Sequence, residues 1–373
     1  MEARSDDDVT MIILFLEGDM SRKGGTERMT AVLANALCES NNVWVLSLQQ
    51  REKSVFFKLD RRVQYEHLDP RGGRLDLLKQ IAEVRQFIHK NHIDVVINVD
   101  IGTSIYGIPA AWGTKAKVIT WEHGNYYNNW GSRWFPYFRR FAAKHSAALV
   151  VLTEKDKQNY EANPRSKKPI YVIPNPIDRH DYHYDSASKT ILSAGLLLPI
   201  KGFDQAIQAA AKVLSKHPDW KWIICGEGPE REKLESLICD AHLENQLLLP
   251  GTVTDMEKQY QKAALYVMTS QMEGLPMVLL EAKSWGLPIV SYDIMTGPSD
   301  IVRDGVNGYL VEPNNVDALT KRLTELMDDS TLREEFSAQS QLDMERFDIA
   351  HIVKQWESVL GYEEKNPIPF GSL

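Results

Sequence analysis

Short apolar runs alternate with stretches of helical periodicity from about residue 11 to residue 360. The runs are continuously apolar, as is typical of strands buried on both faces of a parallel sheet. Their alternation with helices predicts an α/β architecture that occurs twice along the chain. The expected strands are 11–17, 43–48, 94–99, 117–121, 148–153, 170–173, 190–194, 221–225, 247–250, 265–269, 288–292 and 308–311. The expected helices include 26–39, 75–91, 204–216, 230–241, 278–285 and 316–327.

A break separates the two repeats at Pro174-Asn175-Pro176-Ile177-Asp178, and a polar run follows it. Two prolines around an asparagine disfavour both a helix and a central strand. Two domains are also what a chain of 373 residues favours. We therefore expect domains at residues 1–178 and 179–346. Residues 347–373 include apolar side chains at helical spacing, which predicts an amphipathic closing helix.

Composition points to an ordinary globular protein, with 43% hydrophobic and 25% charged residues. We find no apolar run of roughly 18 residues, the length that a membrane-spanning helix needs. The acidic start at residues 1–9 lacks the apolar core of a secretory signal, and the three cysteines show no metal spacing. No Asp-x-Asp follows a predicted strand, so no metal ion is expected. These features predict a cytoplasmic protein that requires no metal.

The segment from Trp130 to Lys144 (WGSRWFPYFRRFAAK) mixes aromatic and basic residues. It lies within a stretch, residues 123–153, that contains no acidic residue, although the whole chain has a net charge of −8. Aromatic anchors beside Arg and Lys suit a helix or loop on an anionic membrane face. The alternative is an ordinary helix that packs its aromatic side chains inward. We expect peripheral contact with the inner face of the cell membrane, and no nucleic-acid partner.

Two glutamates, Glu273 and Glu281, flank the step from the expected strand 265–269 into the expected helix 278–285. Backbone N–H groups at a helix N-terminus form an anion site. Ionised carboxylates accept hydrogen bonds from hydroxyls. An anion site between two hydroxyl acceptors fits a sugar nucleotide, with its diphosphate, hexose and ribose. Two glutamates eight residues apart also occur by chance in a chain of this length, so other motifs must support this interpretation.

Further polar loops follow other predicted strands, at the edge where α/β sheets bind ligands. A lysine such as Lys201 is a flexible point charge suited to phosphate, and His123 can hydrogen-bond a sugar hydroxyl. Taken alone, each loop has a structural alternative: a tight turn, a surface lysine or a structural histidine. The loops are Gly24-Gly25-Thr26-Glu27, Glu122-His123-Gly124, Gly195 with Lys201-Gly202-Phe203-Asp204, Gly226-Glu227-Gly228-Pro229 and Thr296-Gly297-Pro298-Ser299.

Together with Gly274-Leu275-Pro276 and Asp304-Gly305-Val306-Asn307-Gly308, these loops resemble the retaining GT-B glycosyltransferases of family 4, of the polysaccharide-building type. The resemblance extends from about residue 11 to residue 360. It implies two facing Rossmann-like domains with parallel sheets. The nucleotide-sugar donor would bind the second domain, the acceptor mostly the first, and the C-terminal helix would cross back to the first domain.

The resemblance also implies roles for single residues. Glu273 would lie near the transferred sugar, Lys201 would neutralise the diphosphate, and His123 would touch the donor sugar; these three are the expected catalytic residues. Glu281 would hold the ribose. The other residues expected to bind the donor are Gly24, Gly25, Gly195, Gly226, Gly274, Leu275, Pro276, Met277, Val278 and Leu279. One position departs from the pattern, because Leu196 follows Gly195 where the family usually has an arginine that partners the lysine.

The expected reaction is metal-independent transfer of a hexose or N-acetylhexosamine, with retention of configuration, from a nucleotide diphosphate sugar. The expected nucleotide is UDP, and the expected acceptor is a lipid-linked or growing glycan of an envelope or capsular polysaccharide. Two alternatives remain at this point. One is a GT-B sugar-nucleotide epimerase, and the other is a non-catalytic partner subunit of a glycosyltransferase complex, which Leu196 alone favours.

Overall fold

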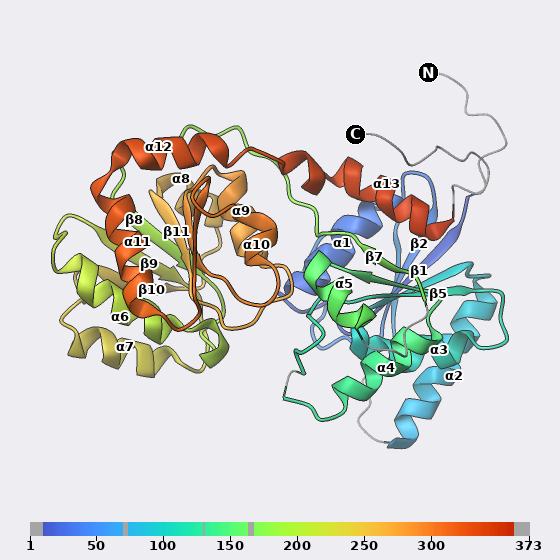
Figure 1. Cartoon of the computed structure of the whole chain (residues 1–373). Coiled ribbons are helices and arrows are strands. Elements are labelled where there is room, and N and C mark those ends of the chain that lie inside the picture. The colour runs from blue at the N-terminus through green and yellow to red at the C-terminus, as the bar shows by residue number, and fades with distance from the viewer. Residues whose placement is uncertain (1–9, 70–73, 130, 163–167, 362–373) are drawn as a thin grey trace. The chain divides into compact units, whose positions relative to one another are not determined.

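The computed structural model describes residues 10–69, 74–129, 131–162 and 168–361. Contacts divide the chain into two compact units, coloured along the chain in Figure 1. Unit 1 is Met1–Pro176 together with Ile349–Leu373, and unit 2 is Ile177–Asp348. The division after Pro176 falls inside the Pro174–Asp178 segment, where two prolines interrupt regular structure.

The sheet of unit 1 has seven strands within the described residues, in the order β3-β2-β1-β4-β5-β6-β7. Every neighbouring pair is parallel. The strand order reverses between β1 and β4, the kind of position at which open α/β sheets bind ligands. The central strand β4 is buried at every position, as its continuous apolar run predicts. The strands are β1 (Ile12–Glu17), β2 (Asn42–Ser47), β3 (Gln64–His67), β4 (Val95–Val99), β5 (Lys117–Trp121), β6 (Ala148–Val151) and β7 (Ile170–Val172).

Helices cover this sheet, and the last helix of the chain is one of them. The helices are α1 (Gly25–Leu37), α2 (Arg74–Lys90), α3 (Ile101–Ala111), α4 (Phe135–His145), α5 (Glu154–Glu161) and α13 (Ile349–Leu360). Figure 1 shows α2, α3 and α4 on one side of the sheet, while α13 packs against α1. Lys117 Nζ donates to the Val359 carbonyl at 2.7 Å, and the buried Trp356 ring lies 5.1 Å from Trp121. These contacts anchor the closing helix to unit 1.

The sheet of unit 2 has six strands among the described residues, in the order β10-β9-β8-β11-β12-β13. All its pairs are parallel, and its order reverses between β8 and β11. Both units are therefore Rossmann-like, which confirms the predicted α/β fold class. The strands are β8 (Thr190–Ala194), β9 (Lys221–Cys225), β10 (Leu247–Gly251), β11 (Leu265–Met268), β12 (Ile289–Tyr292) and β13 (Gly308–Val311).

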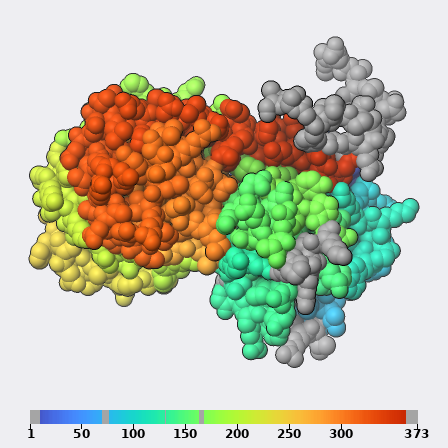
Figure 2. Space-filling model, in the orientation of Figure 1, coloured from blue at the N-terminus to red at the C-terminus, as the bar shows by residue number. Residues whose placement is uncertain are grey.

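The helices of unit 2 are η1 (Pro199–Lys201), α6 (Phe203–Leu214), α7 (Arg231–Asp240), α8 (Met256–Lys262), α9 (Met277–Ser284), α10 (Pro298–Ile301), α11 (Val316–Asp328), α12 (Ser330–Gln339) and η2 (Met344–Phe347). Helix α6 packs on both α7 and α11, and α9 packs on β11 and β12. On the face of unit 2 turned to the viewer in Figure 2, atoms coloured orange to red, from the later part of the unit, form much of the surface.

The polar run 179–189 packs on unit 2 and is part of it. The Tyr184 hydroxyl donates to the Ala264 carbonyl at 2.7 Å, and the Tyr182 hydroxyl donates to the Ser337 carbonyl at 3.2 Å. Ser188 Oγ donates to the Lys262 carbonyl at 2.6 Å. Hydrogen bonds from hydroxyl side chains to backbone carbonyls therefore hold this segment on unit 2, although it has no apolar pattern.

The structure contains each expected strand, with ends that differ by at most two residues, and the elements that it adds include β3 and α3. Strand β3 is a largely exposed edge strand of polar sequence (QYEH), so no apolar run marks it. Helix α3 contains Gly102, Gly107 and Pro109, residues that weaken a helix, but it is largely buried between the sheet, α2 and α4. Burial therefore outweighs local helix propensity in α3.

Candidate functional site

In unit 2, the loops after β8 and β11 lie side by side at the carboxyl edge of the sheet, because these strands are neighbours. Lys201 ends the loop after β8, and Glu273 lies in the loop after β11. Lys201 Nζ and Glu273 Oε1 are 2.6 Å apart, and the two side chains are 22% and 16% exposed. A partly buried ion pair thus sits at the strand-order reversal, where a bound anion and its sugar can reach both groups.

Backbone contacts hold the Lys201 loop against the Glu273 loop. Thr269 Oγ1 donates to the Lys201 carbonyl at 3.0 Å, and the Gln271 N–H donates to the Ile200 carbonyl at 2.8 Å. Gly202 has φ of 62°, and a Cβ there would lie 2.3 Å from the Thr269 carbonyl oxygen. Glycine is therefore required at this position both for its left-handed conformation and for the close approach of the two loops.

The Glu273 loop leads directly into α9. Thr296 Oγ1 donates to the Glu273 carbonyl at 2.6 Å, which ties this loop to the one after β12. A Cβ on Gly297 would lie 2.7 Å from the Gly274 carbonyl oxygen. Leu275 is buried, and Pro276 is the N-cap of α9. These packed contacts place the first turn of α9 at the carboxyl edge of the sheet.

The first turn of α9 contains the backbone groups expected to hold a diphosphate. The Leu279 N–H donates to the Pro276 carbonyl at 3.0 Å, and the Leu280 N–H donates to the same oxygen at 3.3 Å. The N–H of Leu279 is thus used inside the helix, because the carbonyl of the N-cap residue accepts the first intrahelical bonds. Met277 and Val278 precede it in the same turn, and the role of all three backbone groups in holding phosphate stays a prediction.

Other residues of unit 2 that were expected to bind the donor lie near the same edge. A Cβ on Gly226 would lie 1.8 Å from the Gly195 carbonyl oxygen. Only glycine at position 226 therefore allows the turns after β8 and β9 to approach this closely. Leu196 is 62% exposed beside them. Glu281 lies on α9 and accepts a hydrogen bond from the Tyr260 hydroxyl at 2.7 Å. Sequence reasoning did not identify Tyr260, because no local pattern marks it.

In unit 1, the turn that contains His123 follows β5 and is fixed by a buried carboxylate. Glu122 accepts from the Gly124 N–H at 3.0 Å, from the Tyr160 hydroxyl at 2.7 Å and from Arg139 Nε at 3.3 Å. Both Glu122 and Arg139 have side chains that are 1% exposed. Arg139 comes from α4, inside the segment expected to face a membrane, so its buried partner could not be predicted from the sequence.

His123 and Asp100 border this turn. Burial lowers the pKa of His123 to about 3, so its imidazole is neutral at physiological pH. The His123 Nε2 atom is buried with no hydrogen-bond partner among the residues the structure describes. Asp100 directly follows β4, with φ of 67°, and its pKa is raised to about 7 by burial and by the charge of Glu122. Sequence reasoning missed Asp100, although its position at a strand end was a usable signal.

Gly24 and Gly25 begin α1 in unit 1, after β1. Gly24 is the N-cap, and a Cβ there would lie 2.1 Å from a carboxyl oxygen of Glu27. At the end of β1, Glu17 is buried, and its pKa is raised to about 8 by burial and by the charge of Glu27. The carboxyl edge of unit 1 is therefore lined by acids with raised pKa values. The predicted site residues form two groups, with Gly24, Gly25 and His123 in unit 1 and the others in unit 2.

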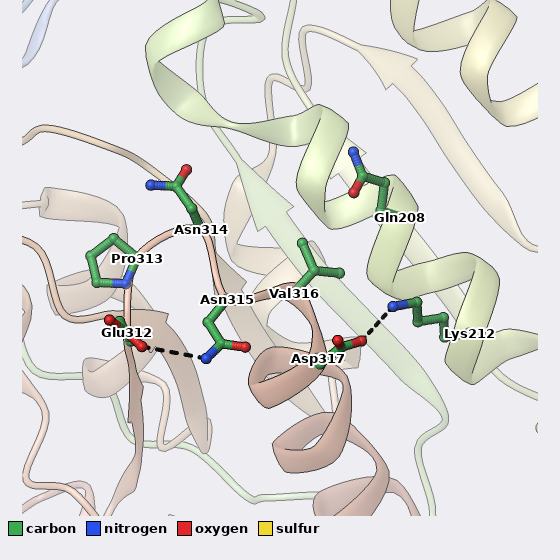
Figure 3. Close-up of a pocket in the computed structure, with 8 residues that line it drawn as sticks. All are labelled: Gln208, Lys212, Glu312, Pro313, Asn314, Asn315, Val316 and Asp317. Carbon is green, nitrogen blue, oxygen red and sulfur yellow. Dashed lines mark hydrogen bonds and ion pairs between the residues drawn. The ribbon is translucent and has the colours of Figure 1, made fainter.

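Figure 3 shows an open polar groove of about 510 Å³ between α6 and the start of α11. Lys212 Nζ lies 2.5 Å from Asp317 Oδ1, and Asn315 Nδ2 donates to Glu312 at 3.4 Å. Much of its polar lining is therefore paired within the groove, and none of the predicted site residues lines it. The groove is formed by Gln208, Lys212, Glu312, Pro313, Asn314, Asn315, Val316 and Asp317.

No group of three or more His, Cys, Asp or Glu side chains among the described residues is placed to hold a metal ion. Metal independence stays a prediction. Within the same residues, every helix is too short or too polar to span a bilayer.

Comparisons with known proteins give the family of the chain. The family model "Glycosyl transferases group 1" matches residues 175–343, and the model "Glycosyltransferase Family 4" matches residues 23–181. An uncharacterized glycosyltransferase of Haemophilus influenzae is 29% identical, over 90% of this chain and 96% of the relative. A Campylobacter jejuni α-1,4-N-acetyl-D-galactosaminyltransferase is also 29% identical, over 92% and 96%, and its name gives a PP-undecaprenol-linked glycan as its substrate.

Among solved structures, Anabaena HepE in complex with UDP and glucose has a TM-score of 0.81 at 20% identity. The match covers 94% of this chain and all of that one. This likeness shows the GT-B fold, and the two family models together account for residues 23–343. The chain therefore belongs to the GT-B glycosyltransferases, with domains of the group 1 and family 4 types.

Proposed function

We propose that this glycosyltransferase moves a hexose or N-acetylhexosamine from a UDP-sugar to a lipid-linked or growing glycan. We further propose that it retains the anomeric configuration and needs no metal ion. The observation that carries the proposal is the Lys201–Glu273 pair, 2.6 Å apart at the strand-order reversal of unit 2. A cation that is already held at this edge can neutralise a departing diphosphate without a divalent ion.

Each of the other groups has a task in the proposed reaction. The sugar–phosphate bond breaks, and the acceptor hydroxyl forms the new bond on the same face of the sugar. The leaving phosphate accepts the proton of that hydroxyl. Glu273 lies beside the sugar, Glu281 accepts from the ribose hydroxyls, and neutral His123 hydrogen-bonds the donor sugar without adding charge.

Two similar proteins support the donor and the acceptor. HepE was solved with UDP and glucose, which favours UDP as the nucleotide bound by this fold. The Campylobacter relative acts, by its name, on a PP-undecaprenol-linked glycan and forms an α linkage. An α linkage is what a retaining enzyme makes from an α-linked donor. Both features belong to those proteins and are proposed here for this chain.

UDP is expected to raise the melting temperature of the purified protein more than GDP or ADP. A ligand that binds only the folded state stabilises it by about 2.7 kcal/mol at a hundred times its Kd. Differential scanning fluorimetry with each nucleotide measures the effect. Lys201→Ala and Glu281→Ala should reduce the shift, because they remove the phosphate cation and the ribose acceptor.

Lys212→Ala is the matched control, since Lys212 is ion-paired on α6 outside the donor loops. Its UDP shift should equal that of the unchanged protein. Absence of a shift with every nucleotide and UDP-sugar would reject the donor proposal and favour a non-catalytic partner subunit. In that case exposed Leu196, in place of the usual arginine, would account for the lost affinity.

We also propose that the outer face of α4 contacts an anionic membrane, which would bring the enzyme to a lipid-linked acceptor. Trp130 lies outside the described residues, but Trp134 and Tyr137 are 52% and 60% exposed. Arg140 and Lys144 are exposed on the same helix. The pKa of His145 is lowered by partial burial and, to a smaller extent, by the charges of Lys144 and Lys168. Aromatic and basic groups on one face suit a lipid interface.

Flotation with phosphatidylserine vesicles is expected to recover the protein at low salt and to recover much less of it at high salt. The double variant Arg140→Glu/Lys144→Glu should stay at the bottom of the gradient. Lys216→Glu/Lys262→Glu makes the same charge change at exposed positions of unit 2 and should float as the unchanged protein does. Equal flotation of both double variants would contradict the proposal.

A further inference from the structure

Two buried tyrosines lie directly behind the donor residues of unit 2. Tyr260 on α8 is 2% exposed, and Tyr266 on β11 is fully buried. Their ring centroids are 6.0 Å apart. A buried tyrosine places its hydroxyl at the end of a rigid ring, so its hydrogen-bond partner is held at a defined position.

The Tyr266 hydroxyl holds the backbone that precedes the Gly195 turn. It accepts from the Ala194 N–H at 3.0 Å and donates to the Ala194 carbonyl at 3.3 Å. Burial raises the pKa of Tyr266 well above its ordinary value, and the charge of Glu281 raises it further, so this phenol stays protonated. The Glu281 carboxylate is therefore close enough to Tyr266 to affect the pKa of its phenol.

The Tyr260 hydroxyl donates to Glu281 Oε2 at 2.7 Å. Glu281 lies on α9, the helix whose first turn is at the Glu273 loop, whereas Tyr260 comes from α8, which precedes β11. The bond therefore joins two consecutive helices, one on each side of β11 in the chain. A hydrogen bond to one carboxylate oxygen restricts the side-chain rotamer and so fixes the direction of the whole carboxylate.

We infer that Tyr260 is the positioning residue that orients Glu281 to accept the ribose hydroxyls of the donor nucleotide. The inference rests on the proposed function, because it takes Glu281 as the ribose acceptor. A binding group held by a rigid second residue loses less conformational freedom when the ligand binds. Without the Tyr260 hydroxyl, Glu281 would sample other rotamers, and the contribution of the ribose hydroxyls to affinity would fall.

The alternative is that Tyr260 only stabilises the packing of α8. Tyr184 offers a matched control, because its hydroxyl also donates a 2.7 Å hydrogen bond, but to the Ala264 carbonyl rather than to Glu281. Tyr260→Phe and Tyr184→Phe each remove one hydroxyl and keep the ring. A purely structural role would lower stability in both variants without changing which nucleotide is preferred.

The test compares the affinities of UDP and 2′,3′-dideoxy-UDP by isothermal titration calorimetry. The unchanged protein should prefer UDP, because only UDP offers ribose hydroxyls to Glu281. Tyr260→Phe should weaken UDP binding by roughly tenfold, the usual scale for a hydrogen bond to a charged group, and leave dideoxy-UDP binding nearly unchanged. Tyr184→Phe should keep the original preference. In a Glu281→Gln background, Tyr260→Phe should cause no further loss of preference.

The possible results separate the inference from the proposed function. Failure of the unchanged protein to bind UDP would reject the proposed donor itself. If the protein binds UDP and prefers it over the dideoxy nucleotide, but Tyr260→Phe keeps the same preference, the positioning role is wrong and the donor proposal stands. Equal weakening of both nucleotides in Tyr260→Phe would likewise assign Tyr260 to packing alone.

Discussion

The Lys201→Met substitution is expected to lower kcat for sugar transfer by roughly 10²–10³-fold. This is the usual effect of removing one group that stabilises developing charge. Lys201 Nζ is held 2.6 Å from Glu273, and the loop that bears it is tied to the Glu273 loop by backbone hydrogen bonds. Its charge is therefore in place before the donor binds. Methionine keeps much of the side-chain volume and removes the charge on which diphosphate departure depends.

The control for this prediction is Lys212→Met, which removes a lysine ion-paired at 2.5 Å on the exposed side of α6. Its kcat should stay within about twofold of the unchanged enzyme, as is usual for exposed ion pairs. Glu273→Gln should cause a loss similar to that of Lys201→Met. The double variant should be little worse than either single variant, because the two groups act as a unit. A Lys201→Met enzyme with undiminished initial rates would place the chemistry elsewhere.

Arg139→Met is expected to destabilise unit 1 by about 3–5 kcal/mol, because it leaves a buried carboxylate without its cation. Arg139 and Glu122 are each 1% exposed, with Nε and Oε2 3.3 Å apart. Arg139 also donates to Asn129 Oδ1 at 2.7 Å and to the Asn128 carbonyl. Loss of the guanidinium therefore removes the charge partner of Glu122 and the support of the loop after His123.

The adjacent Arg140 supplies the control, since its side chain is exposed on the same helix. Arg140→Met should change the melting temperature by little, whereas Arg139→Met should lower it by roughly 10 °C, as the size of unit 1 implies. Adding Glu122→Gln to Arg139→Met should restore part of the loss, because it removes the unpaired charge. Equal melting temperatures for the two single variants would show that Glu122 is protonated or otherwise compensated in the fold.

Much of the fold could be predicted from the sequence because its strands are buried on both faces. Strands such as 117–121 and 221–225 appear in the structure with the predicted bounds, since continuous apolar runs have few other stable placements in an α/β protein. Prediction from the sequence failed for elements whose formation depends on contacts with other elements. Strand β3 is polar and owes its existence to pairing with β2, and α3 keeps two glycines and a proline because it is buried.

The candidate site shows the same division. The glycines, Lys201, Glu273 and His123 lie in loops that follow strands, so their positions at the carboxyl edges could be expected from the sequence. Glu281 lies further along the helix that follows the Glu273 loop. The partners that hold these residues could not be expected in this way. Tyr260 reaches Glu281 from another helix, and Arg139 resembled a surface cation until its buried contact with Glu122 was seen.

By itself, the sequence determined the α/β class, the division near Pro176, the loops at the strand ends and, through its motifs, the glycosyltransferase family. These features depend on apolar periodicity, turn chemistry and residue type, which are local properties of the chain. The tertiary structure alone decided that Lys201 meets Glu273, that Tyr260 holds Glu281 and that Arg139 is buried against Glu122. Each of these pairings depends on which strands become neighbours and on which polar groups are buried against each other. Neither the strand order nor this burial is encoded in any short stretch of residues.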